Sequence, residues 1–327
     1  MMVRPLRIEP HAFILHHRWR HARDFGTGAA SPGPNFRIVA PWGRGRRAAR
    51  GEVARVGTAL TGRVDAVETI TVERGTGEQQ GVVTITLNRP AKKNAINGPM
   101  WDELLETFKD IASRDDDRCV VLTGAGGAFC SGADLSGGPA ERPRHQLHAM
   151  RRVGDVALAL QRIPQPVIAK VPGIAAGAGC TMALGCDLIV ASDEARFSLI
   201  FAKRGLSVDF GGTWLLPRLV GMHKAKELAL FADIISAKEA EAMGLVNRVV
   251  PAGDIDAFVD DWARKLAAGP PIALMQTKRL LTNSFEVTLE QALEDEGWAQ
   301  TVNFGTQDTP EAIKAFIEKR PPHFTGR

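Results

Sequence analysis

The segment Ala175–Asp187 reads AAGAGCTMALGCD and carries no charged side chain before its final aspartate. It follows the apolar run Pro166–Val171, which is typical of a buried strand, and its second half is apolar enough for a buried helix. A turn of such small residues lets a ligand approach the backbone, and the first N–H groups of a helix have no partner within the helix. The segment therefore predicts a strand, a turn and a helix start, with backbone donors facing a negatively charged atom.

A second segment has the same design. Phe129–Leu135, FCSGADL, follows the apolar run Cys119–Thr123 through another glycine-rich turn. Two sets of backbone donors that converge would stabilise an oxyanion. Phosphate is a competing ligand, but neither turn ends in the Lys-Ser or Lys-Thr pair of a nucleotide-binding loop, and neither has a convincing dinucleotide-binding pattern. The structural alternative is that the glycines only permit close packing.

Strand-like and helix-like segments alternate around these two turns. Residues 68–74 and 81–88 alternate polar and apolar side chains on either side of a glycine-containing turn, which predicts a hairpin. Apolar spacing predicts helices over 100–111 and 147–161, and buried strands are expected over 119–123, 166–171 and 188–191. This order predicts an α/β fold with parallel strands and crossover connections.

The C-terminal third has helical character from about Lys224 onward. Ser236 and Glu239 have the spacing of a capping box, and Thr309 followed by Pro310 predicts the start of another helix, with Thr309 as its N-cap. We expect three parts in the chain: a disordered leader at 1–65, an α/β core at 66–255 and a helical region at 256–327.

Charge is distributed unevenly along the 327 residues. Residues 1–63 hold twelve arginines and three acidic residues, a formal charge of +9, whereas the rest holds 29 basic and 34 acidic residues. The basic pI therefore belongs to the leader, and the body of the chain gives no case for nucleic-acid binding.

The cysteines and the leader give predictions about the cellular location of the protein. The four cysteines form no C-x-x-C pair, so we expect reduced thiols, no metal site and a cytoplasmic protein. No apolar run reaches the length of a membrane span, so no membrane association is expected. An Arg-rich leader also suits a transit peptide, which makes the mitochondrial matrix the alternative location.

Five motifs occur in order along the chain. They are Leu87-Asn88-Arg89-Pro90 with Asn94-Ala95, the two glycine-rich segments, the run from Gly205 to Gly221, and Ala242-Met243-Gly244-Leu245-Val246. Together they resemble the enoyl-CoA hydratase/isomerase, or crotonase, superfamily over residues 66–327. The resemblance implies a crotonase-like spiral of ββα units, with a helical C-terminal region that assembles into a homotrimer or a dimer of trimers.

The same resemblance implies an acyl-CoA thioester as substrate and no separate cofactor, because coenzyme A enters as part of the substrate. The backbone N–H groups of Ser131 and of Ala178, next to Gly177, would form the oxyanion hole for the thioester oxygen. Other residues implied in substrate binding are Ala133, Asp134 and Leu135 near the adenine, and Lys92, Lys93 and Lys278 near the phosphates.

The sequence departs from the hydratase pattern at two positions. Hydratases that it resembles hold a water with two glutamates, and Thr181 and Phe201 occupy those positions here. Threonine is no general base near neutral pH, and phenylalanine cannot accept a proton. The pattern therefore puts hydration by the two-glutamate route in doubt.

Asp209 offers a different carboxylate. Its position resembles that of the aspartate in isomerase-like members, in which one carboxylate moves a proton along the acyl chain. Burial beside Val208, Phe210 and Trp214 would raise the pKa of Asp209 and suit it to proton transfer. The alternative is that Asp209 caps the helix that begins near Gly211.

We therefore expect an enzyme that acts on an acyl-CoA thioester through an oxyanion-stabilised enolate, most simply by double-bond isomerisation. Hydration of a 2-enoyl-CoA is the alternative reaction. A non-catalytic acyl-CoA-binding subunit is the third possibility, and it would hold in particular if Asp209 were only a helix cap.

Overall fold

The computed structural model describes residues 69–136 and 145–327. All of these residues lie in the unit that spans 63–327. The leader predicted at 1–65 lies outside the described residues. No helix in residues 69–136 or 145–327 is both long and apolar enough to cross a membrane.

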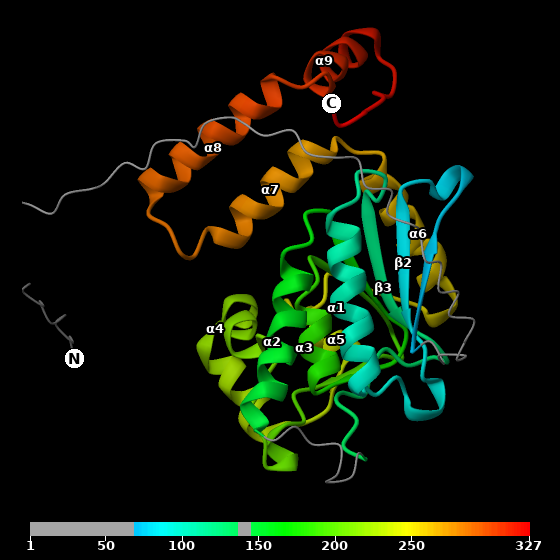
Figure 1. Ribbon diagram of the computed structural model, residues 1–327, viewed down its shortest axis with the longest axis vertical. Coiled ribbons are helices and arrows are strands. Elements are labelled where there is room, and N and C mark those ends of the chain that lie inside the picture. The colour runs from blue at the N-terminus through cyan, green and yellow to red at the C-terminus, as the bar shows by residue number, and fades with distance from the viewer. Residues whose placement is uncertain (1–68, 137–144) are drawn as a thin grey trace, which may run out of the picture. The chain divides into compact units, whose positions relative to one another are not determined.

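Strands and helices alternate up to residue 267, and only helices follow (Figure 1). The strands are β1 Ile70–Arg74, β2 Val82–Leu87, β3 Cys119–Gly124, β4 Val167–Val171, β5 Ile174–Ala176, β6 Leu188–Ser192, β7 Arg196–Ser198, β8 Ile235–Ser236 and β9 Arg248–Val250. The helices are α1 Gly98–Ala112, α2 Gln146–Gln161, α3 Ala178–Leu184, α4 Gly212–Phe231, α5 Ala237–Ala242, α6 Ile255–Ala267, α7 Pro271–Asn283, α8 Leu289–Phe304 and α9 Asp308–Glu318.

The main sheet has the strand order β1-β2-β3-β4-β6-β9, and β5, β7 and β8 form a second, smaller sheet. β1 and β2 form the predicted antiparallel hairpin. The neighbouring pairs from β2 to β9 are all parallel, as the alternation of strands and helices predicts. The α/β prediction is therefore confirmed.

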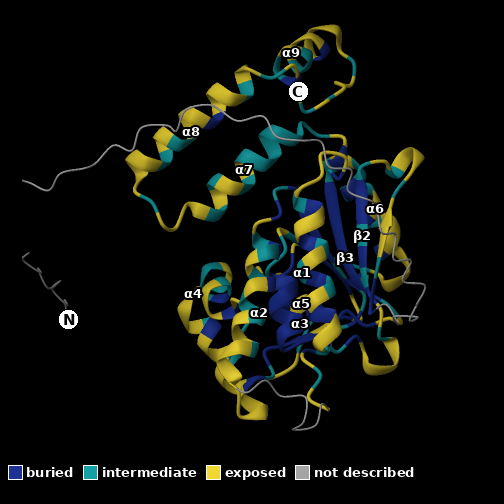
Figure 2. Cartoon of the chain, viewed as in Figure 1, coloured by how far each residue is buried: buried dark blue, intermediate teal, exposed yellow. Residues whose placement is uncertain are grey.

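Alternate side chains of the central strands enter two different cores. In β3, Val120 and Leu122 join the larger core with α1 and α2, whereas Cys119 and Val121 join the smaller core under α6. Both faces of the sheet are thus covered, which explains why β3 is buried along its whole length (Figure 2).

The C-terminal helices divide into two groups. α6 packs on the main sheet, where Ile255 and Val259 are buried, so the residues from 256 to 267 share the core of the strands. α7 and α8 contact each other, and α8 and α9 are largely exposed (Figure 2). Their exposed large apolar side chains are Leu289, Leu293, Trp298, Val302, Phe304, Ile313, Phe316 and Ile317.

The two predicted helix starts have different outcomes. Ser236 caps α5, and its reciprocal bonds with Glu239 form the predicted capping box. The prediction for Thr309 is wrong, because α9 begins at Asp308, two residues before the predicted start at Pro310, and Gln307 is the N-cap residue. The Thr309 hydroxyl instead donates to the carbonyl of Asn303 at 2.6 Å and so joins the ends of two helices.

Candidate active site

The two glycine-rich turns lie against each other. Cys130 and Ala175 form an isolated parallel bridge, which joins the first turn to β5. At Gly132, where φ is +101°, a Cβ atom would lie 2.9 Å from the carbonyl oxygen of Ala176 and 3.6 Å from the nitrogen of Ala178. A side chain would separate the turns, so glycine is needed for this close approach.

Ser131 does not have the free backbone donor predicted from the sequence. Its N–H donates to the carbonyl oxygen of Lys93 at 2.9 Å, and its hydroxyl donates to that of Lys92 at 3.1 Å. Because a backbone N–H has a single hydrogen to donate, the prediction of Ser131 as an oxyanion donor is wrong in this structure.

Ala133 has the free donor in this turn. On either side of it, Ile96 donates to the carbonyl of Gly132 at 2.9 Å and accepts from the N–H of Asp134 at 2.8 Å. In an extended segment, neighbouring N–H groups point to opposite sides. Because the N–H of Asp134 points towards Ile96, the N–H of Ala133 points away from it. It has no hydrogen-bond partner among the described residues, and Ala133 is exposed.

The second donor is Ala178, the first residue of α3. Gly177 precedes it with a φ of +53° and fixes the turn by donating to the carbonyl of Ser198 at 2.9 Å. No acceptor within 69–136 or 145–327 pairs with the Ala178 N–H, as expected in the first turn of a helix. Ala133 and Ala178 thus present two unpaired donors from adjoining turns.

Thr181 and Phe201 occupy positions where neither side chain can activate water. The Thr181 hydroxyl is fully buried and donates to the carbonyl of Ala178 at 3.2 Å, within its own helix. Phe201 lies in the larger hydrophobic core.

Asp209 has the environment of an acid–base group. Its Oδ1 atom is buried and has no hydrogen-bond partner in the described part of the chain. Burial raises the pKa of Asp209 to about 6, which confirms the predicted direction. The capping alternative is wrong, because Gly211 is the N-cap residue of α4 and no side chain caps that helix.

Close packing of α3 and α4 places the segment that holds Asp209 beside the helix that begins at Ala178. A Cβ atom on Gly212 would lie 2.5 Å from Cγ2 of Thr181, so α4 starts directly against α3. Phe210, between Asp209 and that start, has a φ of +50° and stacks on Trp101 with ring centroids 5.8 Å apart. This packing holds an unfavourable backbone conformation beside the carboxylate.

A cluster of side chains on α4 reaches the turn between α7 and α8. The guanidinium of Arg218 lies 3.8 Å from the ring centroid of Trp214 and its Nη2 donates to Glu286 at 2.7 Å. The indole N–H of Trp214 donates to the same carboxylate at 3.4 Å. The helix that follows Asp209 is therefore tied to the C-terminal helices.

Lys278 has a structural contact in place of the phosphate role implied for it. Its Nζ lies 2.6 Å from a carboxylate oxygen of Asp187 and donates to the carbonyl of Gln165 at 2.9 Å. Burial raises the pKa of Asp187, and the charge of Lys278 opposes that shift. A lysine so occupied is not free to bind a CoA phosphate, whereas Lys92 and Lys93 are exposed.

Asp134 also has a structural contact, which sequence reasoning missed. Its carboxylate accepts from Arg89 at 2.9 Å, and hydrogen bonds from Ser136 and Arg89 hold the pKa of Asp134 at about 2. Leu135, the next residue, is 64% exposed and free to meet a ligand. Arg89 belongs to the first of the five sequence motifs. Its partner Asp134 is 45 positions away, so no local sequence pattern predicted the pair.

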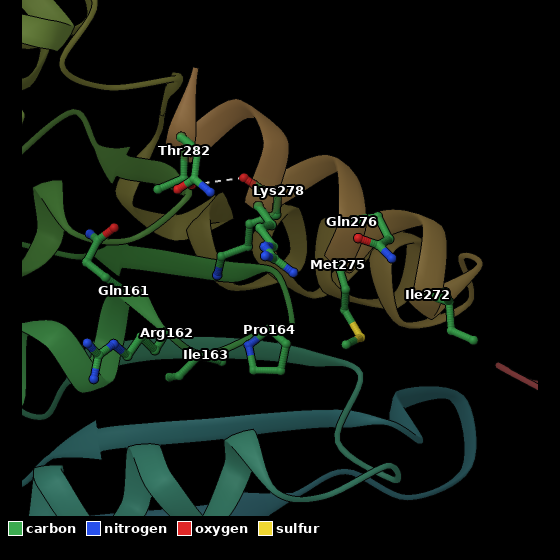
Figure 3. A pocket seen from close by; sticks show the side chains of 11 residues that line it. Gln161, Arg162, Ile163, Pro164, Ile272, Met275, Gln276, Lys278 and Thr282 are labelled. Atoms are coloured by element: carbon green, nitrogen blue, oxygen red, sulfur yellow. Dashed lines mark hydrogen bonds between the residues drawn. The ribbon is translucent and has the colours of Figure 1, made fainter. Parts of the chain in front are cut away.

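A cavity of about 460 Å³ lies between residues 161–164 and α7, with Lys278 in its wall (Figure 3). Its lining residues do not include Asp209, Ala133 or Ala178. The cavity therefore lies at the junction of α7 with the core and is distinct from the two glycine-rich turns.

Comparison with known proteins identifies the class to which this fold and site belong. The family profile described as Enoyl-CoA hydratase/isomerase matches residues 77–327. The chain belongs to this family of enzymes and has its crotonase fold.

Individual relatives carry both reaction names. The chain is 38% identical over 255 residues to the 1,2-epoxyphenylacetyl-CoA isomerase of Escherichia coli, with 76% of this chain and 97% of the relative covered. It is 41% identical over 251 residues to a probable enoyl-CoA hydratase of Rhodobacter capsulatus, with 76% and 96% covered. The crystal structure of an enoyl-CoA hydratase from Bacillus anthracis matches with a TM-score of 0.75 and 35% identity, over 80% of this chain and all of that one.

Proposed function

We propose that this protein is an acyl-CoA isomerase that moves a double bond through a thioester dienolate. The observation that carries the proposal is the half-buried carboxylate of Asp209, which has a pKa of about 6 and precedes a helix packed against α3; its Oδ1 atom is buried and has no hydrogen-bond partner in residues 69–136 or 145–327. A single carboxylate in this state suits a reaction that removes and returns one proton.

The reaction needs two kinds of group. Asp209 removes a proton from C2 of a 3-enoyl-CoA, the electrons move into the thioester carbonyl, and the protonated carboxyl returns the proton to C4. The N–H groups of Ala133 and Ala178 stabilise the negative charge on the thioester oxygen. Loss of one such donor typically costs about 3–4 kcal/mol of transition-state stabilisation. The reaction needs no metal or redox cofactor, because coenzyme A arrives with the substrate.

The remaining substrate contacts are assigned to residues near the turns that are exposed to solvent. Lys92 and Lys93 extend into solvent beside the turn that holds Ala133, so they are the lysines we assign to the CoA phosphates. Leu135 and the backbone of Asp134 follow the oxyanion donor directly and are assigned to the adenine end of coenzyme A. Gly177 supports the second donor through its turn.

We also propose a homotrimer or a dimer of trimers. The support is the set of large apolar side chains that α8 and α9 leave exposed, since exposed apolar patches commonly mark contacts with other protein chains. Sedimentation of the purified protein tests this proposal, since a single species at the mass of the monomer would contradict it.

Hydration of a 2-enoyl-CoA is the second candidate. The 41% identity to a probable enoyl-CoA hydratase favours it. The environment of Thr181 and Phe201 weighs against it, because neither side chain can hold or activate a water.

NMR in D₂O separates the two reactions. The purified enzyme is given a 3-enoyl-CoA in one sample and a trans-2-enoyl-CoA in another. We expect the first to isomerise with deuterium entering the chain, and the second to give no 3-hydroxyacyl product. Rapid formation of 3-hydroxyacyl-CoA would overturn the isomerase proposal, and binding without exchange or turnover would indicate a non-catalytic acyl-CoA-binding protein.

A further inference from the structure

Arg89 lies next to the first oxyanion donor without touching it. Its Nη1 donates to the carbonyl of Ala95, and its Nη2 donates to Oδ2 of Asp134 at 2.9 Å. The side chain of Arg89 is 21% exposed and that of Asp134 is 14% exposed, so the pair is largely shielded from water. We call Arg89 and Asp134 the loop clasp.

The loop clasp spans the segment whose geometry sets the donor. Ala95 precedes Ile96, and Ile96 and Ala133 form an isolated parallel bridge. Asp134 follows Ala133 directly. The two N–H groups of the guanidinium thus hold one residue on each side of this bridge, and the direction of the Ala133 N–H depends on both.

The backbone of Arg89 is held in place by Asn94. Its backbone N–H donates to Oδ1 of Asn94 at 2.9 Å, and Nδ2 of Asn94 donates to the carbonyls of Ala128 and Phe129 at 2.8 and 3.2 Å. Asn94 is fully buried and has a φ of +57°. The clasp is therefore connected through Asn94 to the backbone at the start of the glycine-rich loop.

The carboxylate is fixed at its other oxygen. Oδ1 of Asp134 accepts from the backbone N–H of Ser136 at 3.0 Å and from its hydroxyl at 2.5 Å. Oδ2 is left for Arg89 alone. Both partners of the loop clasp have their orientation set before any substrate is bound, which is the condition for a preorganised donor.

We propose that Arg89 and Asp134 are positioning residues that aim the Ala133 N–H at the thioester oxygen. The inference rests on the proposed function, because it assigns a catalytic task to that N–H. Neither side chain touches the substrate. A lysine at position 89 would keep the charge and lose the planar fork that serves two acceptors at once.

Asp134→Asn and Arg89→Lys test the loop clasp. In D134N the amide oxygen can keep the Ser136 contacts, while the NH₂ group faces the donors of Arg89 and breaks the pair. Arg74→Lys is the matched control, since Arg74 also divides its guanidinium between two acceptors, Asp110 and Asp117, at the edge strand. Thermal unfolding of each variant shows whether it is folded.

Two readouts separate positioning from stability. Isomerase kinetics with a 3-enoyl-CoA should show kcat lowered by about 10- to 100-fold in D134N and R89K, with little change in KM, since a small misplacement of a reacting group has effects of this size. The ¹³C shift of enzyme-bound [1-¹³C]hexanoyl-CoA, which is saturated and inert, should move downfield in the unmodified enzyme and return towards the free value in both variants. R74K should match the unmodified enzyme in both assays.

The outcomes keep the two proposals distinct. If the unmodified enzyme causes no downfield shift of the bound carbonyl, the oxyanion site itself is refuted and the proposed function falls with it. If the shift is present and folded R89K or D134N retains both it and full kcat, the loop clasp has no positioning role. If one variant fails to fold, the other decides the question by the same two readouts.

Discussion

Replacement of Asp209 by asparagine should lower activity and raise stability at the same time. Asparagine cannot take up a proton, and general acid–base catalysis contributes about 10²- to 10⁴-fold. The loss corresponds to roughly 3–5 kcal/mol in the activation free energy, at about 1.36 kcal/mol for each factor of ten. The purified D209N variant should therefore bind acyl-CoA with nearly unchanged affinity and turn over a 3-enoyl-CoA at least a hundredfold more slowly.

The stability gain follows from the direction of the pKa shift. Burial raises the pKa of Asp209 from 3.8 to about 6, so the folded protein binds a proton more tightly than the unfolded chain. This contribution to stability is fully present below pH 3.8 and is lost as the pH rises through 6. Two pKa units correspond to at most about 3 kcal/mol, and partial exposure of the side chain reduces the expected effect to about 1 kcal/mol.

Thermal unfolding between pH 4 and pH 8 measures this effect. At pH 8 the D209N variant should unfold about 2–4 °C above the unmodified protein, and the difference should disappear near pH 4. Asp155→Asn on the exposed face of α2 is the matched control and should leave Tm unchanged at both values. If D209N is no more stable at pH 8, the carboxylate is not held in an unfavourable environment and the reasoning is wrong. In the unmodified enzyme, kcat/KM should fall about tenfold per pH unit below a pKa of about 6.

Three further substitutions test the packing around the site. Thr181→Val should keep kcat within about threefold, because the hydroxyl contacts only its own helix; a loss beyond a hundredfold in steady-state kinetics would make it a catalytic group. Gly179→Ala should destabilise the fold by about 3 kcal/mol in urea unfolding, since its Cβ would lie 2.4 Å from the Cys130 carbonyl; an unchanged midpoint would show that the loop can yield. Lys278→Met should cost about 2–3 kcal/mol by leaving the carboxylate of Asp187 without an opposite charge, and a Tm equal to that of the unmodified protein would refute this anchoring of α7.

The fold was predictable because its signals are local. Alternating side chains predicted the β1–β2 hairpin, and short apolar runs predicted the buried strands β3, β4 and β6. Exact helix starts were harder. Thr309 has a suitable side chain and a proline after it, yet Gln307 is the N-cap residue of α9, and the Thr309 hydroxyl donates to the carbonyl of Asn303 instead.

The general nature of the site was predictable from the sequence. Individual residue roles were predicted wrongly where they depend on contacts between segments that are distant in the sequence. Small residues indicated a backbone oxyanion site, but only the structure shows that the carbonyl of Lys93 accepts from the N–H of Ser131, whereas the N–H of Ala133 has no partner among the described residues. Lys278 carried the charge expected of a phosphate ligand, but its partner Asp187 is 91 positions away in the sequence. Asp209 was selected by its motif and apolar neighbours, and its burial agrees with that selection.

The two donors of the proposed oxyanion hole belong to the backbone of Ala133 and Ala178, and this determines which chemical changes can remove them. Substitution by any residue except proline leaves the amide N–H in place, so a complete alanine scan would not detect either group. Replacement of the amide by an ester, through an α-hydroxy acid incorporated at position 133 or 178, deletes the N–H without adding the ring of proline. By the same property, natural substitutions could change the surrounding side chains to fit new acyl groups while the proposed oxyanion hole stayed intact.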